Sequence, residues 1–451
     1  MKKYLLPLFC FLNVLSYAQI EGTWKGDIQI PMQKLPFVIT IEKHNNEWIG
    51  IGESPQETNH KINFKTVTFQ NDTLKIDEPK LGMQYIGVLK DNTTIEGKFS
   101  QRGMTFTLNL EKGEYKLNRP QMPSPPFAYD TKEITFYNDK ADINLSGTLT
   151  IPKGKGKYPT VILVTGSGPQ DRDETIAGHK PFLVIADYLS KNGYAVLRYD
   201  DRGVGKSEGN FSEASTLDFA TDTEAAINYL KKQKFVDNKK IGILGHSEGG
   251  MVAQIVAAHS KDIHFIISLA GPGIPNDQLM IIQKTAIERA MGIPELSIKM
   301  NERVFGKMYE IAKKDTPNEV AEAEIKNFLK NDPVYKNIPE NQLQELIDQV
   351  LNKWFRASIK YDPNEYFSKI KAKVLALNGE KDLQVTAKEN LKGWKDGLAH
   401  NKYVTVKSYP KLNHMFQKAV TGLPNEYGEI ETTIEPVVLE DILNWLNENV
   451  K

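Results

Sequence analysis

The first hundred residues after the N-terminal segment alternate between apolar and polar positions. In residues 23–30 the even positions are Trp, Gly, Ile and Ile, while the odd ones are mostly polar, and residues 104–110 repeat the pattern. A period of two with a polar outer face is typical of half-buried antiparallel strands. Eight segments are candidate strands, and several of them alternate in this way: 23–30, 37–43, 48–53, 64–69, 73–77, 85–89, 94–99 and 105–110. They predict a β-rich accessory domain over residues 19–118.

Eight meandering strands favour a small barrel or a strongly curved sheet for this block. Its opening residues, GTW at 22–24, resemble the start of lipocalin-like barrels. The following segment, 119–126, contains four prolines and is therefore expected to be an extended linker.

From residue 127 to residue 451 short β-branched runs alternate with helical patterns. Such runs are typical of strands buried on both faces. The pattern predicts an α/β domain with an open, mostly parallel, doubly wound sheet of eight strands. The expected strands are 134–137, 143–151, 161–164, 194–199, 241–244, 263–269, 374–377 and 403–409.

Residues 272–370 carry no strand signal and show helical periodicity between proline-containing turns. We interpret them as a helical cap inserted after the sixth strand. A separate helical domain is the alternative, but the return of a strand pattern at Val374 favours an insertion.

The charges balance, with 57 Lys and Arg against 57 Asp and Glu, and no basic cluster stands out. This argues against nucleic acid or an anionic membrane as the main partner.

Residues 1–18 have the form of a secretory signal peptide. Two lysines precede a short apolar core at 4–15, and Ser16-Tyr17-Ala18 suits cleavage before Gln19. The run is too short for an uncleaved membrane anchor, the alternative. Cys10, the single cysteine, lies inside this segment, so the mature chain is expected to lack disulfides and thiol chemistry. We expect a bacterial protein that is exported, either periplasmic or secreted.

Residues 240–260 combine an apolar run, a glycine-rich break and an amphipathic helical pattern. The break reads GHSEG at 245–249, which has the form G-x-S-x-G. A serine at a sharp strand-to-helix turn presents its hydroxyl above the sheet, and the glycines let strand and helix pass closely. The motif predicts Ser247 as a nucleophile. It also predicts the N–H of Glu248, at a helix N-terminus, as a donor to a developing oxyanion.

A serine nucleophile needs a general base and a carboxylate that orients it. Asp382 follows the strand run at 374–377, and Glu380 is the alternative acid. His414 follows the last strand run, so the order along the chain is Ser, Asp, His. We expect Ser247, Asp382 and His414 to form a catalytic triad.

The second oxyanion donor is expected from the glycine-containing loop that follows the third strand, at 164–173. The Ser167 N–H is the first candidate and the Gly168 N–H the second. In the same loop Asp171 and Arg172 are expected to form an ion pair that holds its shape.

Two other histidines come close to the motifs: His246 is expected to pack beneath the turn, and His179 is a candidate pocket residue. No histidine–carboxylate cluster has metal-ligand spacing, and no dinucleotide fingerprint is present. The prediction is therefore no metal and no cofactor.

Several motifs together give the chain beyond residue 133 a family resemblance. They are GSGPQDRDE (166–174), HKPFLVIADYL (179–189), RYDDRGVGKSEG (198–209), GHSEGG (245–250), LNGEKDLQV (377–385) and LNHMFQ (412–417). The chain resembles the α/β-hydrolase superfamily, in particular bacterial carboxylesterases with an accessory N-terminal domain, related to the serine aminopeptidase and dienelactone-hydrolase branches. The resemblance implies the same triad and esterase activity on small acyl esters without a cofactor.

We interpret the chain as a carboxylesterase that cleaves esters of small to medium acyl chains through an acyl-enzyme. The expected partner is a small-molecule ester, with no nucleic acid and no membrane span after signal cleavage. One alternative is a serine peptidase or aminopeptidase of the same fold, with cap carboxylates such as Glu310 and Glu322 holding the peptide amine. Another is a ligand-binding protein in which the β-rich block is the functional part.

Overall fold

The computed structural model describes residues 20–30, 33–55 and 61–451, so the predicted signal peptide lies outside the described residues. The chain divides into two compact units, Met1–Leu117 and Asn118–Lys451. The division falls at the start of the proline-rich segment.

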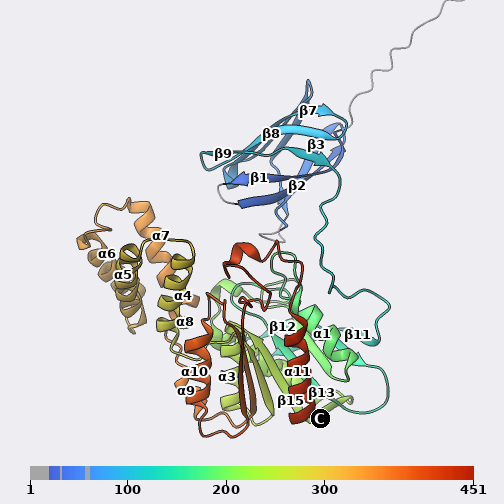
Figure 1. The fold of residues 1–451 in the computed structure, drawn as a ribbon, viewed down its shortest axis with the longest axis vertical. Coiled ribbons are helices and arrows are strands. Elements are labelled where there is room, and N and C mark those ends of the chain that lie inside the picture. Colours follow the sequence, from blue (N-terminus) through green and yellow to red (C-terminus); the bar gives the residue numbers. More distant parts are fainter. Residues whose placement is uncertain (1–19, 31–32, 56–60) are drawn as a thin grey trace, which may run out of the picture. The chain divides into compact units, whose positions relative to one another are not determined.

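The first unit is an antiparallel sheet, with ten strands in its described part (Figure 1). They are β1 (Gly22–Ile30), β2 (Gln33–His44), β3 (Glu47–Glu53), β4 (Ile62–Asn63), β5 (Thr66–Gln70), β6 (Thr73–Glu78), β7 (Met83–Asp91), β8 (Thr94–Gln101), β9 (Met104–Thr107) and β10 (Leu110–Lys112). The order is β4-β3-β2-β1-β10-β8-β7-β6-β5, with β9 paired to β8. Alternate positions on these strands supply a core that includes Trp24, Ile39 and Tyr85.

The strand count differs from the eight that the alternation predicts. Two residues, Ile62 and Asn63, add the short strand β4, and the last expected strand is divided into β9 and β10. The division arises because β9 pairs only with β8, whereas β10 also pairs with β1. Met104, which the alternation places on the apolar face, is 60 % exposed because it begins β9 directly after the turn at Gly103.

The second unit is built on a mixed sheet of eight strands. They are β11 (Tyr129–Asn138), β12 (Ile143–Pro152), β13 (Tyr158–Val164), β14 (Ala195–Tyr199), β15 (Val236–His246), β16 (Phe265–Leu269), β17 (Lys373–Gly379) and β18 (Val404–Tyr409). Their order is β11-β12-β14-β13-β15-β16-β17-β18. β11 pairs antiparallel with β12, and β12 antiparallel with β14. The remaining neighbours are parallel, so the carboxyl ends of β13 to β18 share one edge.

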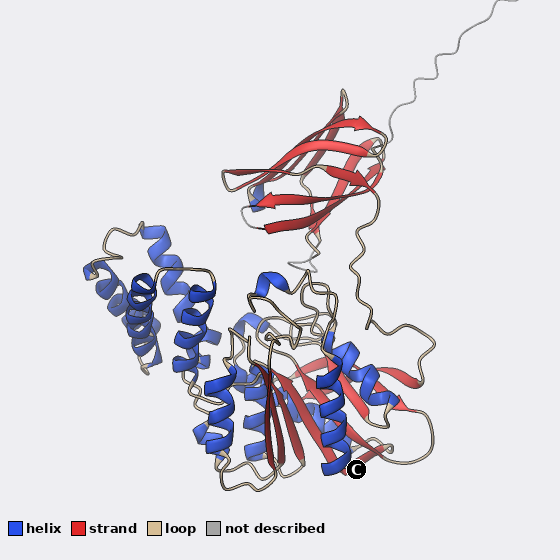
Figure 2. Cartoon of the chain, in the orientation of Figure 1, coloured by secondary structure: helices blue, strands red, loops and turns tan. Residues whose placement is uncertain are grey.

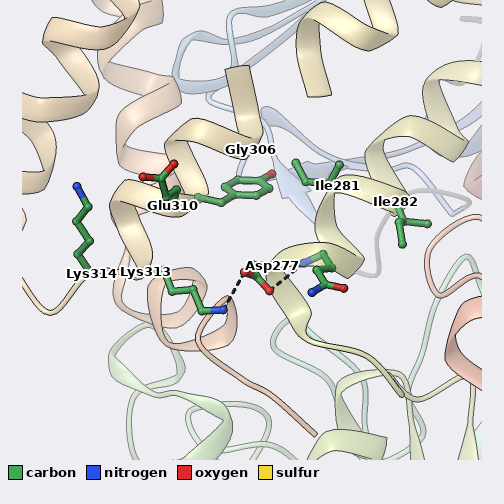
Figure 3. A pocket seen from close by; sticks show the side chains of 9 residues that line it. Asp277, Ile281, Ile282, Gly306, Glu310, Lys313 and Lys314 are labelled. Atoms are coloured by element: carbon green, nitrogen blue, oxygen red, sulfur yellow. Dashed lines mark hydrogen bonds and ion pairs between the residues drawn. The ribbon is translucent and has the colours of Figure 1, made fainter. Parts of the chain in front are cut away.

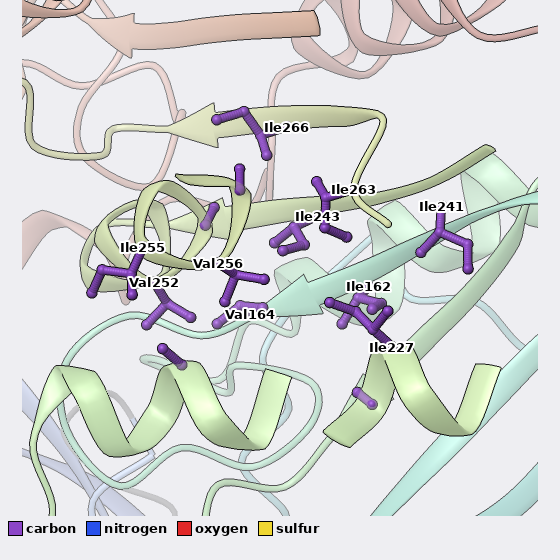
Figure 4. Packing of buried hydrophobic residues seen from close by; sticks show 14 of the residues in the cluster. Ile162, Val164, Ile227, Ile241, Ile243, Val252, Ile255, Val256, Ile263 and Ile266 are labelled. Carbon is purple, nitrogen blue, oxygen red and sulfur yellow. The ribbon is translucent and has the colours of Figure 1, made fainter. Parts of the chain in front are cut away.

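Helices cover both faces of this sheet (Figure 1). They are α1 (Pro181–Lys191), α2 (Thr216–Lys231), α3 (Glu248–His259), α10 (Ala387–Gly397) and α11 (Pro436–Asn449). One hydrophobic cluster joins the sheet to α2, α3 and α10, and a second joins it to α1 and α11. Figure 4 shows the first cluster, where Val252 and Val256 of α3 pack beside Val164 and Ile243. Burying such side chains contributes roughly 1.5–3 kcal/mol each, which anchors α3 to the sheet.

In the sequence, a block of helices without strands separates β16 from β17, although these two strands are neighbours in the sheet (Figure 2). It contains α4 (Asn276–Ala290), α5 (Glu295–Lys313), α6 (Asn318–Asn331), α7 (Glu340–Leu351), α8 (Lys353–Ser358) and α9 (Asn364–Phe367). Helices α5 to α7 contribute to a core of their own that includes Met308, Ile325 and Ile347. The chain therefore leaves the sheet, folds a helical cap and returns to the adjacent position.

Candidate active site

Ser247 occupies a one-residue turn between β15 and α3. Its backbone has φ 51° and ψ −117°, in the left-handed half of conformational space. A non-glycine residue there costs about 1–3 kcal/mol, and it persists where the surroundings force it. The Ser247 N–H donates to Leu269 O at 2.9 Å, and its carbonyl accepts the Gly250 N–H at 2.9 Å.

The glycines of the motif are required by close backbone approaches. A Cβ at Gly245 would lie 2.0 Å from the carbonyl oxygen of Gly249. A Cβ at Gly249 would lie 2.1 Å from Val164 O. Because neither oxygen belongs to a movable side chain, any larger residue would push α3 away from β13 and β15 and misplace Ser247.

Asp382 and His414 are brought together from loops 32 residues apart. His414 Nδ1 lies 2.8 Å from Asp382 Oδ2, and both side chains are buried. The other oxygen, Asp382 Oδ1, accepts the N–H groups of Gln384 and Val385 at 2.8 Å each. The carboxylate therefore has a fixed orientation, and its bond to Nδ1–H leaves Nε2 of a neutral His414 ring as the basic atom.

The alternative acid, Glu380, points elsewhere. Its carboxylate accepts the Ser408 hydroxyl at 2.7 Å on an exposed part of β18. Of the two sequence candidates, only Asp382 reaches His414.

His246, the residue that precedes Ser247, contacts His414. The His246 ring lies 4.7 Å from the His414 ring between centroids, and its Nε2 is 3.1 Å from His414 O. Within the described residues the Ser247 hydroxyl is not hydrogen-bonded to His414. Such bonds are often long before a substrate is bound and tighten in the complex.

The loop after β13, which carries Ser167, runs directly beside Ser247. A Cβ at Gly166 would lie 3.2 Å from Ser247 Cβ, so the glycine allows the close approach. The Gly166 N–H donates to Glu174 Oε1 at 2.7 Å, whereas Gly168 has φ 94°. Within the described part of the chain the Ser167 N–H has no protein acceptor, so it is free to donate to a bound oxyanion.

Glu248 adds a contact between the turn and the cap that the sequence does not suggest. Its buried carboxyl receives the Thr216 hydroxyl at 2.6 Å and the Trp354 indole N–H at 3.0 and 3.1 Å. Burial raises the pKa of Glu248, against the effect of these hydrogen bonds. Since Trp354 belongs to α8, this contact connects the cap to the residue that follows Ser247.

The prediction that Asp171 and Arg172 form an ion pair is wrong. Arg172 instead donates to both oxygens of Asp200, at 2.9 and 2.7 Å. The Asp171 carboxylate accepts from the backbone of Asp173 and Thr175, so it closes a local turn. The loop is thus held by a residue from the end of β14, which lies beside β13 in the sheet.

His179, a candidate pocket residue on sequence, is a structural histidine. It is fully buried, with Nδ1 2.9 Å from the Thr433 hydroxyl and Nε2 2.9 Å from Tyr427 O. Burial, assisted by Arg119, lowers the pKa of His179 to about 4. The ring is therefore neutral at pH 7.

The neutral His179 predicts a loss of stability in acid. Because its folded pKa, about 4, lies below the ordinary 6.5, its stabilising effect is complete above pH 6.5. The effect is lost as the pH falls from 6.5 toward 4. In thermal melts, the Tm difference between wild type and His179→Gln is expected to narrow over this range. A difference that stays constant would contradict the assignment.

An open pocket of about 550 Å³ lies between α4 and α5 of the cap (Figure 3). Ile281 and Tyr309 line it, and the Asp277–Lys313 ion pair, at 2.8 Å, lies at one side. Glu310 also lines it but is exposed and paired with Lys307 at 2.8 Å. The other acid proposed for a peptide amine, Glu322, is hydrogen-bonded to Gln344. Both carboxylates therefore already have a partner that a peptide amine would have to displace.

Two further properties concern the described residues as a whole. No group of three or more His, Asp or Glu side chains among them is arranged to hold a metal ion. None of the helices in the same ranges combines the length and apolar content needed to cross a membrane.

Sequence comparisons relate the chain to a protein family and to a similar protein. The family profile of the X-Pro dipeptidyl-peptidase (S15 family) matches residues 142–408. Esterase EstD of Thermotoga maritima is 27% identical over 445 residues, covering 97% of this chain and 94% of its own.

Two solved structures are also similar to the chain. The esterase Pf2001 of Pyrococcus furiosus aligns with a TM-score of 0.45 and 17% identity, covering 75% of this chain and 100% of its own. Est1E of Butyrivibrio proteoclasticus, solved with ferulic acid, aligns with a TM-score of 0.42 and 18% identity, covering 70% and 99%.

The family match covers strands β12 to β17, the turn with Ser247 and the loop with Asp382. It confirms the resemblance to α/β-hydrolases, although the matching branch is S15. The chain belongs to the X-Pro dipeptidyl-peptidase (S15) family and is a hydrolase of the α/β-hydrolase fold.

Proposed function

We propose that this hydrolase is a carboxylesterase that acts on small to medium acyl esters through Ser247, His414 and Asp382. The observation that carries the proposal is the buried His414–Asp382 hydrogen bond, 2.8 Å long, which His246 connects to the strained strand-to-helix turn at Ser247. This arrangement supplies a nucleophile, a base and an orienting carboxylate.

The proposed reaction has two steps. The Ser247 hydroxyl attacks the ester carbonyl while His414 Nε2 takes its proton, and the same proton then passes to the leaving alcohol. Water, activated by His414, attacks the acyl-enzyme and releases the carboxylic acid and free Ser247. Asp382 stabilises the imidazolium that forms in each step.

The negative oxygen of each tetrahedral intermediate requires donors that are already in place. We assign this role to the N–H of Glu248, at the start of α3, and to that of Ser167, with Gly168 as the alternative second donor. Loss of one such donor costs about a hundredfold or more in kcat.

A peptidase activity is the second candidate, favoured by the S15 family match. The pairing of Glu310 with Lys307 and of Glu322 with Gln344 speaks against these two acids as an amine site. Similarity to an esterase over nearly the whole chain supports ester substrates.

The preference of the enzyme for ester or anilide substrates distinguishes the two candidate functions. Mature protein from Gln19 onward is tested on p-nitrophenyl acetate, butyrate and octanoate, and in parallel on aminoacyl and X-Pro p-nitroanilides. We expect kcat/KM to be higher for the esters and to peak at a short or medium chain. A higher kcat/KM on the anilides would replace the esterase with a peptidase.

The N-terminal segment supports the further proposal that the enzyme is exported, to the periplasm or the medium. Its substrate is a small ester. Fractionation of the native bacterium, with N-terminal sequencing of the protein, tests the export and the start at Gln19.

A further inference from the structure

A second carboxylate–imidazole pair lies beneath the proposed active site. Glu174 and His246 are both buried, with side-chain exposures of 1% and 6%, and neither belongs to the proposed triad. Glu174 also has a left-handed backbone, with φ 52°, an unfavourable conformation for this residue that its surroundings must impose.

The contacts of this pair determine its protonation. Glu174 Oε1 accepts the Gly166 N–H at 2.7 Å and lies 2.8 Å from His246 Nδ1. His246 Nε2 lies 3.1 Å from His414 O, a carbonyl that can only accept. Since a carboxylic acid is stronger than an imidazolium, the shared proton belongs to the ring. Both ring nitrogens therefore donate, and His246 is an imidazolium paired with a carboxylate.

The electrostatic surroundings agree with this state. Burial alone would lower the pKa of His246, but the Glu174 carboxylate more than offsets it and the net pKa is raised. Asp382 acts in the same direction from the other side. The His414 ring also contacts the His246 ring, and Glu174 acts electrostatically on Asp201.

The pair joins the three segments that carry the proposed chemistry. Through Gly166 it holds the loop that presents the Ser167 N–H. Through the backbone of His246 it is continuous with Ser247, and through His414 O it holds the loop of the base. In a hydrolytic site a displacement of about 1 Å costs on the order of a hundredfold in rate.

We propose that Glu174 and His246 form a charged positioning pair that sets the oxyanion loop and the His414 loop at their working distances from Ser247. This role rests on the proposed function. Because both side chains are buried, the loss of the pair should impair the transition state more than substrate binding.

The kinetic experiment compares Glu174→Gln and His246→Gln with wild type on p-nitrophenyl butyrate. Each variant is expected to lose about ten- to a hundredfold in kcat while KM changes little. Affinity for an alkyl boronic acid, which becomes tetrahedral on the serine, should fall in parallel with kcat. His179→Gln is the matched control, because it removes another buried imidazole; it should lower Tm but keep kcat.

A spectroscopic experiment tests the charge without relying on activity. In ¹⁵N-histidine-labelled protein at about pH 8, above the ordinary pKa of histidine, both nitrogens of His246 should be protonated. The signal is assigned by its loss in His246→Gln, and Glu174→Gln should convert the ring to the neutral form. A singly protonated His246 in wild type would overturn the proposal.

The outcomes separate the two proposals. Unchanged kcat in both variants, with wild type active, would refute the positioning role and leave the esterase intact. No Ser247-dependent hydrolysis in wild type would refute the proposed function, and the positioning role with it. If kcat fell in proportion to Tm in Glu174→Gln and His246→Gln, and by the same relation in His179→Gln, the pair would have only a structural role.

Discussion

Ser247→Ala is expected to reduce kcat for p-nitrophenyl esters by on the order of 10⁴- to 10⁶-fold. The variant removes the atom that forms the acyl-enzyme, so only transition-state binding by the remaining site is left. The turn itself should survive, because its hydrogen bonds to Leu269 and Gly250 use the backbone of residue 247. Tm is therefore expected to stay close to the wild-type value, and substrate binding is expected to persist.

The measurement is steady-state kinetics on the ester series, with the mass of the protein followed after reaction with a fluorophosphonate. Wild type should gain one adduct and Ser247→Ala none. Ser260→Ala is the control, since Ser260 lies at the opposite end of the same helix, α3. Ester hydrolysis that persists in Ser247→Ala would assign the reaction to another residue.

Asp382→Asn is expected to lower kcat by about 10⁴-fold while the fold is retained. Both parts of this expectation follow from the different hydrogen bonds that the two oxygens of the Asp382 carboxylate make. Asn can keep an oxygen where Oδ1 accepts the Gln384 and Val385 N–H groups, so the turn remains closed. The amide nitrogen then faces His414 Nδ1 and donates to it, which moves the ring proton to Nε2. A ring protonated at Nε2 cannot accept the proton of Ser247.

Glu380→Gln provides the matched control for Asp382→Asn. It changes a carboxylate two positions earlier on the same loop, one that binds Ser408 and not His414. Its kcat is expected to remain within about threefold of wild type, in line with the small effects of surface substitutions. If Glu380→Gln were the more damaging change, the orienting acid would have to be reassigned.

The sequence was sufficient where function follows from local pattern. The glycines around Ser247, the strand before it and the helix after it all lie within residues 240–260. Asp382 and His414 could be predicted because each follows a short apolar run, and the carboxyl ends of parallel strands meet at one edge of a sheet. The β-branched runs also predicted all eight strands of the second unit, with ends that differ by up to five residues.

Other parts of the sequence pattern were ambiguous. Helix α10 was not expected, because residues 387–397 are dominated by polar side chains with few apolar ones. The short strand β4 carries only two residues, too few for a period to be seen. The division of the last strand of the first unit depends on pairing with β1, more than eighty residues earlier.

What only the tertiary structure decided is which polar side chains meet. Alternation and motif spacing say that Arg172, Glu174 and Glu248 lie near the site, but not that their partners are Asp200, His246 and Trp354. Each pairing joins segments 28 to 106 residues apart. A buried polar group must be hydrogen-bonded, and the packing of the strands and the cap determines which partner lies within reach. The sequence by itself indicated the candidate nucleophile and the order of its expected partners. The packing of loops around the sheet determined which surrounding side chains hold these residues in place.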